Sequence, residues 1–219
     1  MGVWVWFHKL VTDERMRDSE RLAATGNVAA RADWLVQRVR AGELSSTRLQ
    51  LAAYVGDEGA LEALTSEEIP APPARRLIWF RRPDQGFRDW VSGLAENWPR
   101  PKEIAVRVCV ALVAHEAQAT LTPVPHEGWH LVDFAKGWLG NPDLELQEPC
   151  PLLPYEVGLC LGFLRSALVW GTPEAHEWTG PARAMREAAA VCAKHTSPNE
   201  VRARLKEVLL EWALGSEES

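Results

Sequence analysis

The sequence lacks several features that would assign it directly to a class of proteins. It contains no run of about 18 apolar residues, so we expect no membrane-spanning helix. Its first residues show neither a basic leader nor a small-residue cleavage site, and we expect no secretory signal. It also has no glycine-rich phosphate loop after a strand, no Gly-x-Ser-x-Gly elbow and no Cys-x-x-Cys pair. Nucleotide-binding, serine-hydrolase and dithiol redox functions are therefore without support.

The sequence is also short of positive charge. It holds 24 Lys and Arg residues against 30 Asp and Glu residues, which gives a net charge of -6. Proteins that coat a phosphate backbone rely on an excess of Lys and Arg, so nucleic acid is not the expected partner. An acidic protein is better suited to a basic protein partner.

Phenylalanine and tyrosine are scarce, with 5 and 2 residues, whereas tryptophan occurs 11 times. This excess of Trp indicates either wide contacts between helices or a binding surface. Of the four cysteines, Cys109, Cys160 and Cys192 lie in apolar helical runs, where free cysteine packs as a small hydrophobic residue. We therefore expect free thiols and a cytoplasmic protein.

Helical periodicity is what the sequence has in abundance. Apolar residues recur at helical spacing in most segments, and Gly, Pro or Asn separates the segments. The last helix begins with Ser197-Pro198-Asn199-Glu200, which combines an N-cap, a proline at the first helical position and a capping box. Residues 3–7 alternate Val with aromatic residues and predict a short strand or an apolar arm. The sequence predicts helices over about residues 13–25, 28–40, 46–55, 58–64, 87–97, 103–119, 126–139, 155–170, 181–195 and 198–214. Either Ser45 or Ser46 is expected to cap the third of these.

Short helices with short links pack as antiparallel neighbours, so the predicted fold class is all-α. We expect an array of about ten helices, either armadillo- or HEAT-like or an irregular bundle. The stretch Ile69-Pro70-Ala71-Pro72-Pro73-Ala74 cannot be helical, because each proline removes a backbone donor. It predicts a stiff spacer at 69–76 between an N-terminal subdomain at 1–68 and a C-terminal subdomain at 77–219. One continuous domain is the alternative.

One short motif suggests metal chemistry. His126-Glu127-Gly128-Trp129-His130 matches the zinc-protease pattern, in which two histidines one helical turn apart bind zinc and the glutamate activates water. Pro125 and Gly128 place the motif in the first turn of its helix, where we expect fraying, and we interpret it as a helix start with Glu127 near the positive end of the dipole. A zinc-dependent hydrolase with ligands His126 and His130 and base Glu127 stays the alternative. A third ligand would have to come from His115, Glu145, Glu148 or Glu156.

A basic stretch between residues 75 and 102 is interleaved with aromatic residues. Such a mixture can bind an acidic protein segment, or single-stranded nucleic acid by stacking and phosphate pairing. The simpler interpretation is that aromatic residues at helical spacing belong to the core. The candidates for contact with a partner are Arg81, Arg82, Trp90 and Trp98.

The run Arg38-Val39-Arg40-Ala41-Gly42-Glu43-Leu44-Ser45, followed by Arg48-Leu49-Gln50-Leu51-Ala52-Ala53-Tyr54-Val55-Gly56, resembles a signature of a family of uncharacterised helical bacterial proteins. The resemblance implies a helical fold similar to armadillo and HEAT arrays, and it carries no catalytic residue across. The second half of the chain, with its buried helix, proline turn and Ala-rich helices, is similar to helical immunity proteins that neutralise bacterial toxins.

These observations favour a non-enzymatic, cytoplasmic, protein-binding module. It would serve either as an adaptor or scaffold, or as an immunity protein bound to a toxin. No cofactor is expected under this hypothesis, and zinc belongs to the hydrolase alternative. The sequence leaves the oligomeric state open.

Overall fold

The structure is a computed structural model, and every regular element that it describes is an α-helix. This confirms the predicted all-α, multi-helix array, with nine helices in the described part of the chain. Contacts divide the chain into two compact units, residues 1–82 with 209–219 and residues 83–208. The described residues are Arg21, 26–66, Ile69, 86–121, 123–142, 150–151, 159–170 and 180–215.

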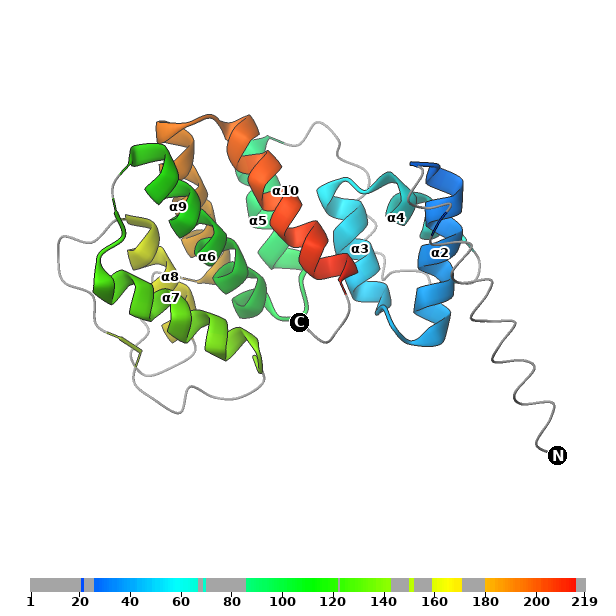
Figure 1. Cartoon of the computed structure of the whole chain (residues 1–219), viewed down its shortest axis with the longest axis horizontal. Coiled ribbons are helices and arrows are strands. Elements are labelled where there is room, and N and C mark those ends of the chain that lie inside the picture. Colours follow the sequence, from blue (N-terminus) through cyan, green and yellow to red (C-terminus); the bar gives the residue numbers. More distant parts are fainter. Residues whose placement is uncertain are drawn as a thin grey trace. The chain divides into compact units, whose positions relative to one another are not determined.

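The first unit contains three short helices with strong start and stop signals. They are α2 (Val28–Ala41), α3 (Ser46–Val55) and α4 (Glu58–Ala63), and α4 packs against both of the others (Figure 1). The side chains of Asn27, Ser45 and Asp57 cap the three helices, each accepting a hydrogen bond from a backbone N–H in the first turn. Gly42 and Gly56 end α2 and α3 in the left-handed conformation that glycine adopts without steric cost.

Two arginines of the signature stretch bind the last turn of α10 (Pro198–Leu214), whose residues from Leu209 belong to this unit. Arg38 donates to the carbonyl oxygen of Leu214 at 2.6 Å, and Arg48 donates to the carbonyl oxygen of Trp212. The last carbonyls of a helix lack intrahelical partners and carry partial negative charge. The two guanidinium groups therefore cap α10 and hold its last turn against α2 and α3.

A partly buried ion pair joins α2 to the start of α4. Asp57 accepts hydrogen bonds from Arg31 Nη2 at 2.6 Å and Nε at 3.0 Å, and from the Ala60 N–H at 2.8 Å. The Arg31 stem lies against Gly59, where an added Cβ would be 2.6 Å from Arg31 Cγ. Gly59 thus provides the space that lets the guanidinium group reach Asp57.

The second unit is organised around α6, whose apolar residues are buried on nearly every side. From Ile104 to Val113 only Arg107 and Val110 are not buried. Helices α5, α7, α8 and α9 all pack against α6, and α9 also contacts α5 and α8 (Figure 1). The helices of this unit, besides the first part of α10, are α5 (Phe87–Asn97), α6 (Pro101–Thr120), α7 (His126–Leu139), α8 (Leu159–Val169) and α9 (Pro181–His195).

Several sequence predictions lie outside the described residues. They are the segment at 3–7, most of the helix at 13–25, the start of the helix predicted from residue 155, and the proline spacer at 69–76 apart from Ile69. The first unit includes residues 209–219, although the proline spacer predicted them to lie in the C-terminal subdomain. None of the described helices is long and apolar enough to cross a membrane.

Candidate functional site

Helix α7 has a buried face and an exposed face, and it carries the zinc-protease-like motif. Gly128, Leu131, Val132 and Ala135 form the buried face, toward α6 and α8. The exposed face is polar apart from one tryptophan. The exposed residues of α7 are His126, Glu127, Trp129, His130, Asp133, Lys136 and Gly137.

The motif lies in the first turn of α7, as predicted, but that turn is closed. The carbonyl oxygen of Pro125 accepts from the N–H groups of Gly128 at 2.9 Å and Trp129 at 3.2 Å. A Cβ at Gly128 would lie 2.7 Å from both Leu161 Cδ1 and Val124 Cγ1. The first turn of α7 is therefore hydrogen-bonded, and the absence of a side chain at Gly128 lets the start of α7 pack closely against α8. The fraying expected from the sequence stays a prediction.

The two motif histidines meet at their ring nitrogens. His126 Nε2 and His130 Nε2 are 3.0 Å apart, and the rings meet edge to face, with their centroids 4.3 Å apart. Both side chains are exposed. One ring donates this hydrogen bond and the other accepts it, and the tautomers decide which. The spacing of one helical turn thus brings two imidazole donors to one point on the surface.

A third ligand for this pair is not found among the predicted candidates that the structure describes. His115 Nε2 lies 3.3 Å from Thr196 Oγ1, between α6 and the end of α9. Glu145, Glu148 and Glu156 lie outside the described residues. Within the described part of the chain, no group of three or more His, Cys, Asp or Glu side chains is placed to hold a metal ion.

The connection from α6 to α7 exposes two large apolar side chains. Leu121 is 89% exposed and Trp129 is 43% exposed. Leu121 has a φ of 53°, and it is the one non-glycine residue with positive φ in the described part of the chain. We call residues 121 and 123–130 the α6–α7 corner. The sequence did not single out Leu121, because its exposure depends on where α6 ends. The available signal was the pair of prolines at 123 and 125, which marks the break between the two helices.

The predicted partner-binding residues are not on this corner. Trp90 and Trp98 are 5% and 7% exposed, so both indole rings lie in the interior of the second unit. The guanidinium carbon of Arg202 lies 5.1 Å from the Trp90 ring centroid, a cation–π contact between α10 and α5. Their burial agrees with the simpler interpretation of these aromatic residues as core. Arg81 and Arg82 lie outside the described residues.

Three buried thiols lie where α6, α8 and α9 pack together. Cys160 Sγ and Cys192 Sγ are 3.5 Å apart, and Cys192 Sγ lies 3.5 Å from the Leu112 carbonyl oxygen. The hydrogen bond with Cys192 and burial raise the pKa of the Cys160 thiol, and burial raises the pKa of the Cys109 thiol. Nucleophilic cysteines need the thiolate form, so these thiols are suited to packing and not to catalysis.

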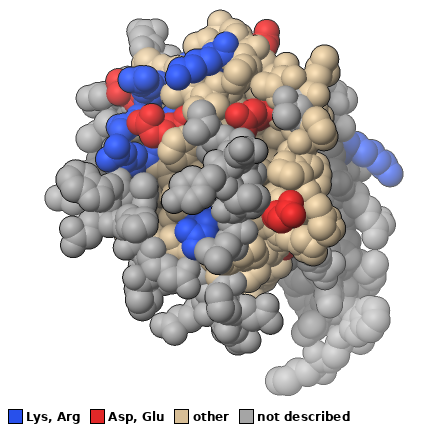
Figure 2. Space-filling model, turned by 90° about the vertical axis from the view of Figure 1, so that its left-hand side faces the viewer, with Lys and Arg blue, Asp and Glu red and all other residues tan. Residues whose placement is uncertain are grey.

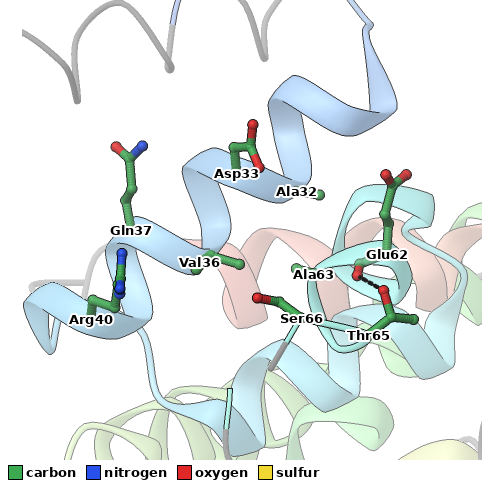
Figure 3. A pocket seen from close by; sticks show the side chains of 9 residues that line it. All are labelled: Ala32, Asp33, Val36, Gln37, Arg40, Glu62, Ala63, Thr65 and Ser66. Carbon is green, nitrogen blue, oxygen red and sulfur yellow. Dashed lines mark hydrogen bonds between the residues drawn. The ribbon is translucent and has the colours of Figure 1, made fainter. Parts of the chain in front are cut away.

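A hollow of about 410 Å³ lies between α2 and α4 in the first unit (Figure 3). Asp33 and Glu62 bring negative charge to its lining, and Arg40 brings positive charge. Thr65 Oγ1 donates to the Glu62 carbonyl oxygen at 2.7 Å, which closes the turn after α4. The sequence singled out no ligand-binding pattern here, and we assign this hollow no ligand.

Charge is mixed on the face shown in Figure 2. Acidic and basic side chains lie close together near one edge, and much of the described surface on this face carries neither sign. A nucleic-acid groove needs a continuous basic track. The described side chains on this face do not form one.

Comparison of the chain with protein-family models, with curated proteins and with solved structures found no match in any of the three.

Proposed function

We propose that this chain is a non-enzymatic protein-binding module that contacts its partner through the α6–α7 corner. The observation that carries the proposal is Leu121, which is 89% exposed and held at a φ of 53°. Both properties act against stability. A left-handed backbone costs an L-residue about 1–2 kcal/mol, and an exposed leucine contributes little hydrophobic burial in return.

Glycine or asparagine at position 121 would suit this helix end better, since either residue tolerates the left-handed conformation. A leucine there has a physical use if its side chain is buried in a complex. Strained backbone and exposed apolar side chains both concentrate at binding sites.

Trp129 lies on the exposed face of α7, in the first turn of the helix. Tryptophan is among the residues that most often dominate the binding energy of an interface. The net charge of -6 suits a basic partner. The partner is another protein, either a client of an adaptor or a toxin neutralised by an immunity protein. The four buried free cysteines support a cytoplasmic location.

The test is affinity capture with the full chain as bait, using the wild type, Leu121→Asn and Trp129→Ala. We expect a protein recovered with the wild type to bind each corner variant at least about tenfold more weakly, in keeping with interface hot spots. Leu61→Ala is the matched control, because Leu61 is also an exposed apolar residue, 44% exposed, but lies in the first unit. Capture of nonspecific background alone, or equal loss with the control, contradicts the proposal.

Leu121→Asn is the more informative of the two corner variants. We expect it to fold at least as stably as the wild type, so weaker binding would report a lost contact and not unfolding. For the immunity role in particular, co-expression with a toxin encoded by a neighbouring gene should restore growth with the wild type and not with Leu121→Asn.

The alternative function is a zinc-dependent hydrolase, favoured by the 3.0 Å distance between His126 Nε2 and His130 Nε2. A catalytic zinc ion usually has three protein ligands and one open position. In this alternative, Glu127 activates the attacking water. Zinc-dependent hydrolysis of peptide or ester substrates that is lost in Glu127→Gln, with zinc still bound, would favour the enzyme.

A further inference from the structure

The two histidines of α7 place two potential metal ligands side by side, which protein binding does not require. His126 and His130 lie one turn apart on the exposed face, and their Nε2 atoms approach to 3.0 Å. Solubility does not require two surface histidines to contact each other. A single hydrogen bond between exposed rings also contributes little to stability.

The distance between the two nitrogens fits shared coordination of one ion. Imidazole nitrogen binds Zn²⁺ at about 2.0–2.1 Å, so two nitrogens at a right angle around the ion are about 2.9 Å apart, and two at the tetrahedral angle are about 3.3 Å apart. The observed 3.0 Å lies between these values. Ion binding would replace the hydrogen bond between the rings: the proton on the donating Nε2 would move to Nδ1, and both side chains would rotate until the two Nε2 lone pairs face the ion.

The backbone that carries the pair is held in place. The first turn of α7 is closed onto the carbonyl oxygen of Pro125, and Gly128 is packed against Leu161 of α8. Ion binding would therefore order two side chains and no backbone, which keeps its entropic cost low. The structure thus presents the two donors on a preformed frame.

We infer that His126 and His130 chelate one divalent transition-metal ion of the class that prefers imidazole, such as Zn²⁺, Ni²⁺ or Cu²⁺. No further His, Cys, Asp or Glu of the described residues joins the pair, so exchangeable ligands such as water complete the shell. Ca²⁺ and Mg²⁺ prefer oxygen ligands and should not bind here. The inference does not rest on a protein partner, and it differs from the hydrolase alternative because it needs no third protein ligand and no hydrolysis; ion binding without hydrolysis would support the inference and not the enzyme.

The experiment is calorimetric titration of the full, untagged chain with Ni²⁺, Co²⁺ and Zn²⁺ in turn, after treatment with a chelator and its removal. We expect one ion per chain and tighter binding of Ni²⁺ than of Co²⁺, following the usual order of divalent metals. Two linked donors can exceed either alone by a factor of about 100 or more. His126→Ala, His130→Ala and His130→Gln should each weaken binding about that much.

His195→Ala is the matched control, because His195 is an exposed histidine at the end of α9. It should bind the ion as the wild type does, and circular dichroism should show unchanged helix content in every variant. Absence of binding to the wild type would overturn the inference. So would affinities of the three pair variants within about threefold of the wild type, since chelation predicts a far larger loss.

Discussion

Replacing Gly128 by alanine tests whether close packing explains the glycine in the middle of the motif. Inside a helix, alanine is favoured over glycine by about 0.8–1.0 kcal/mol. At Gly128 the new Cβ would lie 2.7 Å from Leu161 Cδ1 and from Val124 Cγ1, which is closer than these carbons can approach. Overpacking of this kind costs about 1–3 kcal/mol. We therefore expect Gly128→Ala to be destabilised by up to about 2 kcal/mol.

Gly137 provides the matched control on the same helix. A Cβ at Gly137 would have no atom within 4 Å, so Gly137→Ala should gain stability from helix propensity alone, by up to about 1 kcal/mol. The two free energies of unfolding, measured by urea titration with circular dichroism, should differ by about 1–3 kcal/mol. In a chain of this size each kcal/mol also shifts Tm by about 2–4 °C.

A second substitution locates the source of the cost. Leu161→Val shortens the side chain and removes the Cδ1 methyl group that the new Cβ would meet. In the wild type this substitution should lower the free energy of unfolding by about 1 kcal/mol. In the Gly128→Ala background the same change should cost less, giving a coupling energy of at least about 0.5 kcal/mol. Equal stabilisation by Gly128→Ala and Gly137→Ala, or perfect additivity with Leu161→Val, would refute the close contact between α7 and α8.

Three further changes test other parts of the structure by urea unfolding. Asp57→Ala removes the cap of α4 and the partner of the half-exposed Arg31, and it should cost about 2–3 kcal/mol, whereas Asp33→Ala, at an exposed position, should cost little. Leu121→Asn should stabilise the chain by up to about 1 kcal/mol, and a loss of stability would show that the left-handed backbone is not a source of strain. Burial raises the pKa of the Cys109 thiol above its ordinary value of 9.0. The stabilisation from keeping this thiol protonated in the folded state is therefore fully present below about pH 9 and is lost progressively as the pH rises. Above about pH 9, stability should fall with pH less steeply in Cys109→Ala than in the wild type, by about 1.4 kcal/mol per pH unit, and identical slopes would contradict this.

Most of what the sequence predicted correctly is local along the chain. Gly42 and Gly56 end their helices because no other residue adopts the left-handed conformation as readily, and Ser45 starts α3 because its side chain accepts from the Arg48 N–H at 3.2 Å. These signals depend on residues within one turn of each other. Helix type and approximate ends could therefore be predicted without knowledge of packing.

Contacts between distant helices could not be predicted in the same way. Arg38 reaches the carbonyl oxygen of Leu214 across 176 positions of sequence, and Cys160 meets Cys192 across 32. Neither pair carries a local pattern, because it depends on how whole helices pack. Trp90 illustrates the ambiguity, since an aromatic residue on an amphipathic helix fits a binding surface and a core equally well until its neighbours are known.

Gly128 shows what a local rule leaves out at the candidate site, namely the packing of one helix against another. Glycine weakens an isolated helix, and on that basis the first turn of α7 was expected to fray. In the folded chain the same missing side chain brings α7 against Leu161, and this contact holds the turn that carries His126 and His130. The residue that costs helix propensity thus stabilises the frame. The start of α7 thus carries two exposed histidines on a packed, hydrogen-bonded turn, in the same corner as the exposed Leu121. Under the proposed function, little order would have to be acquired there on binding.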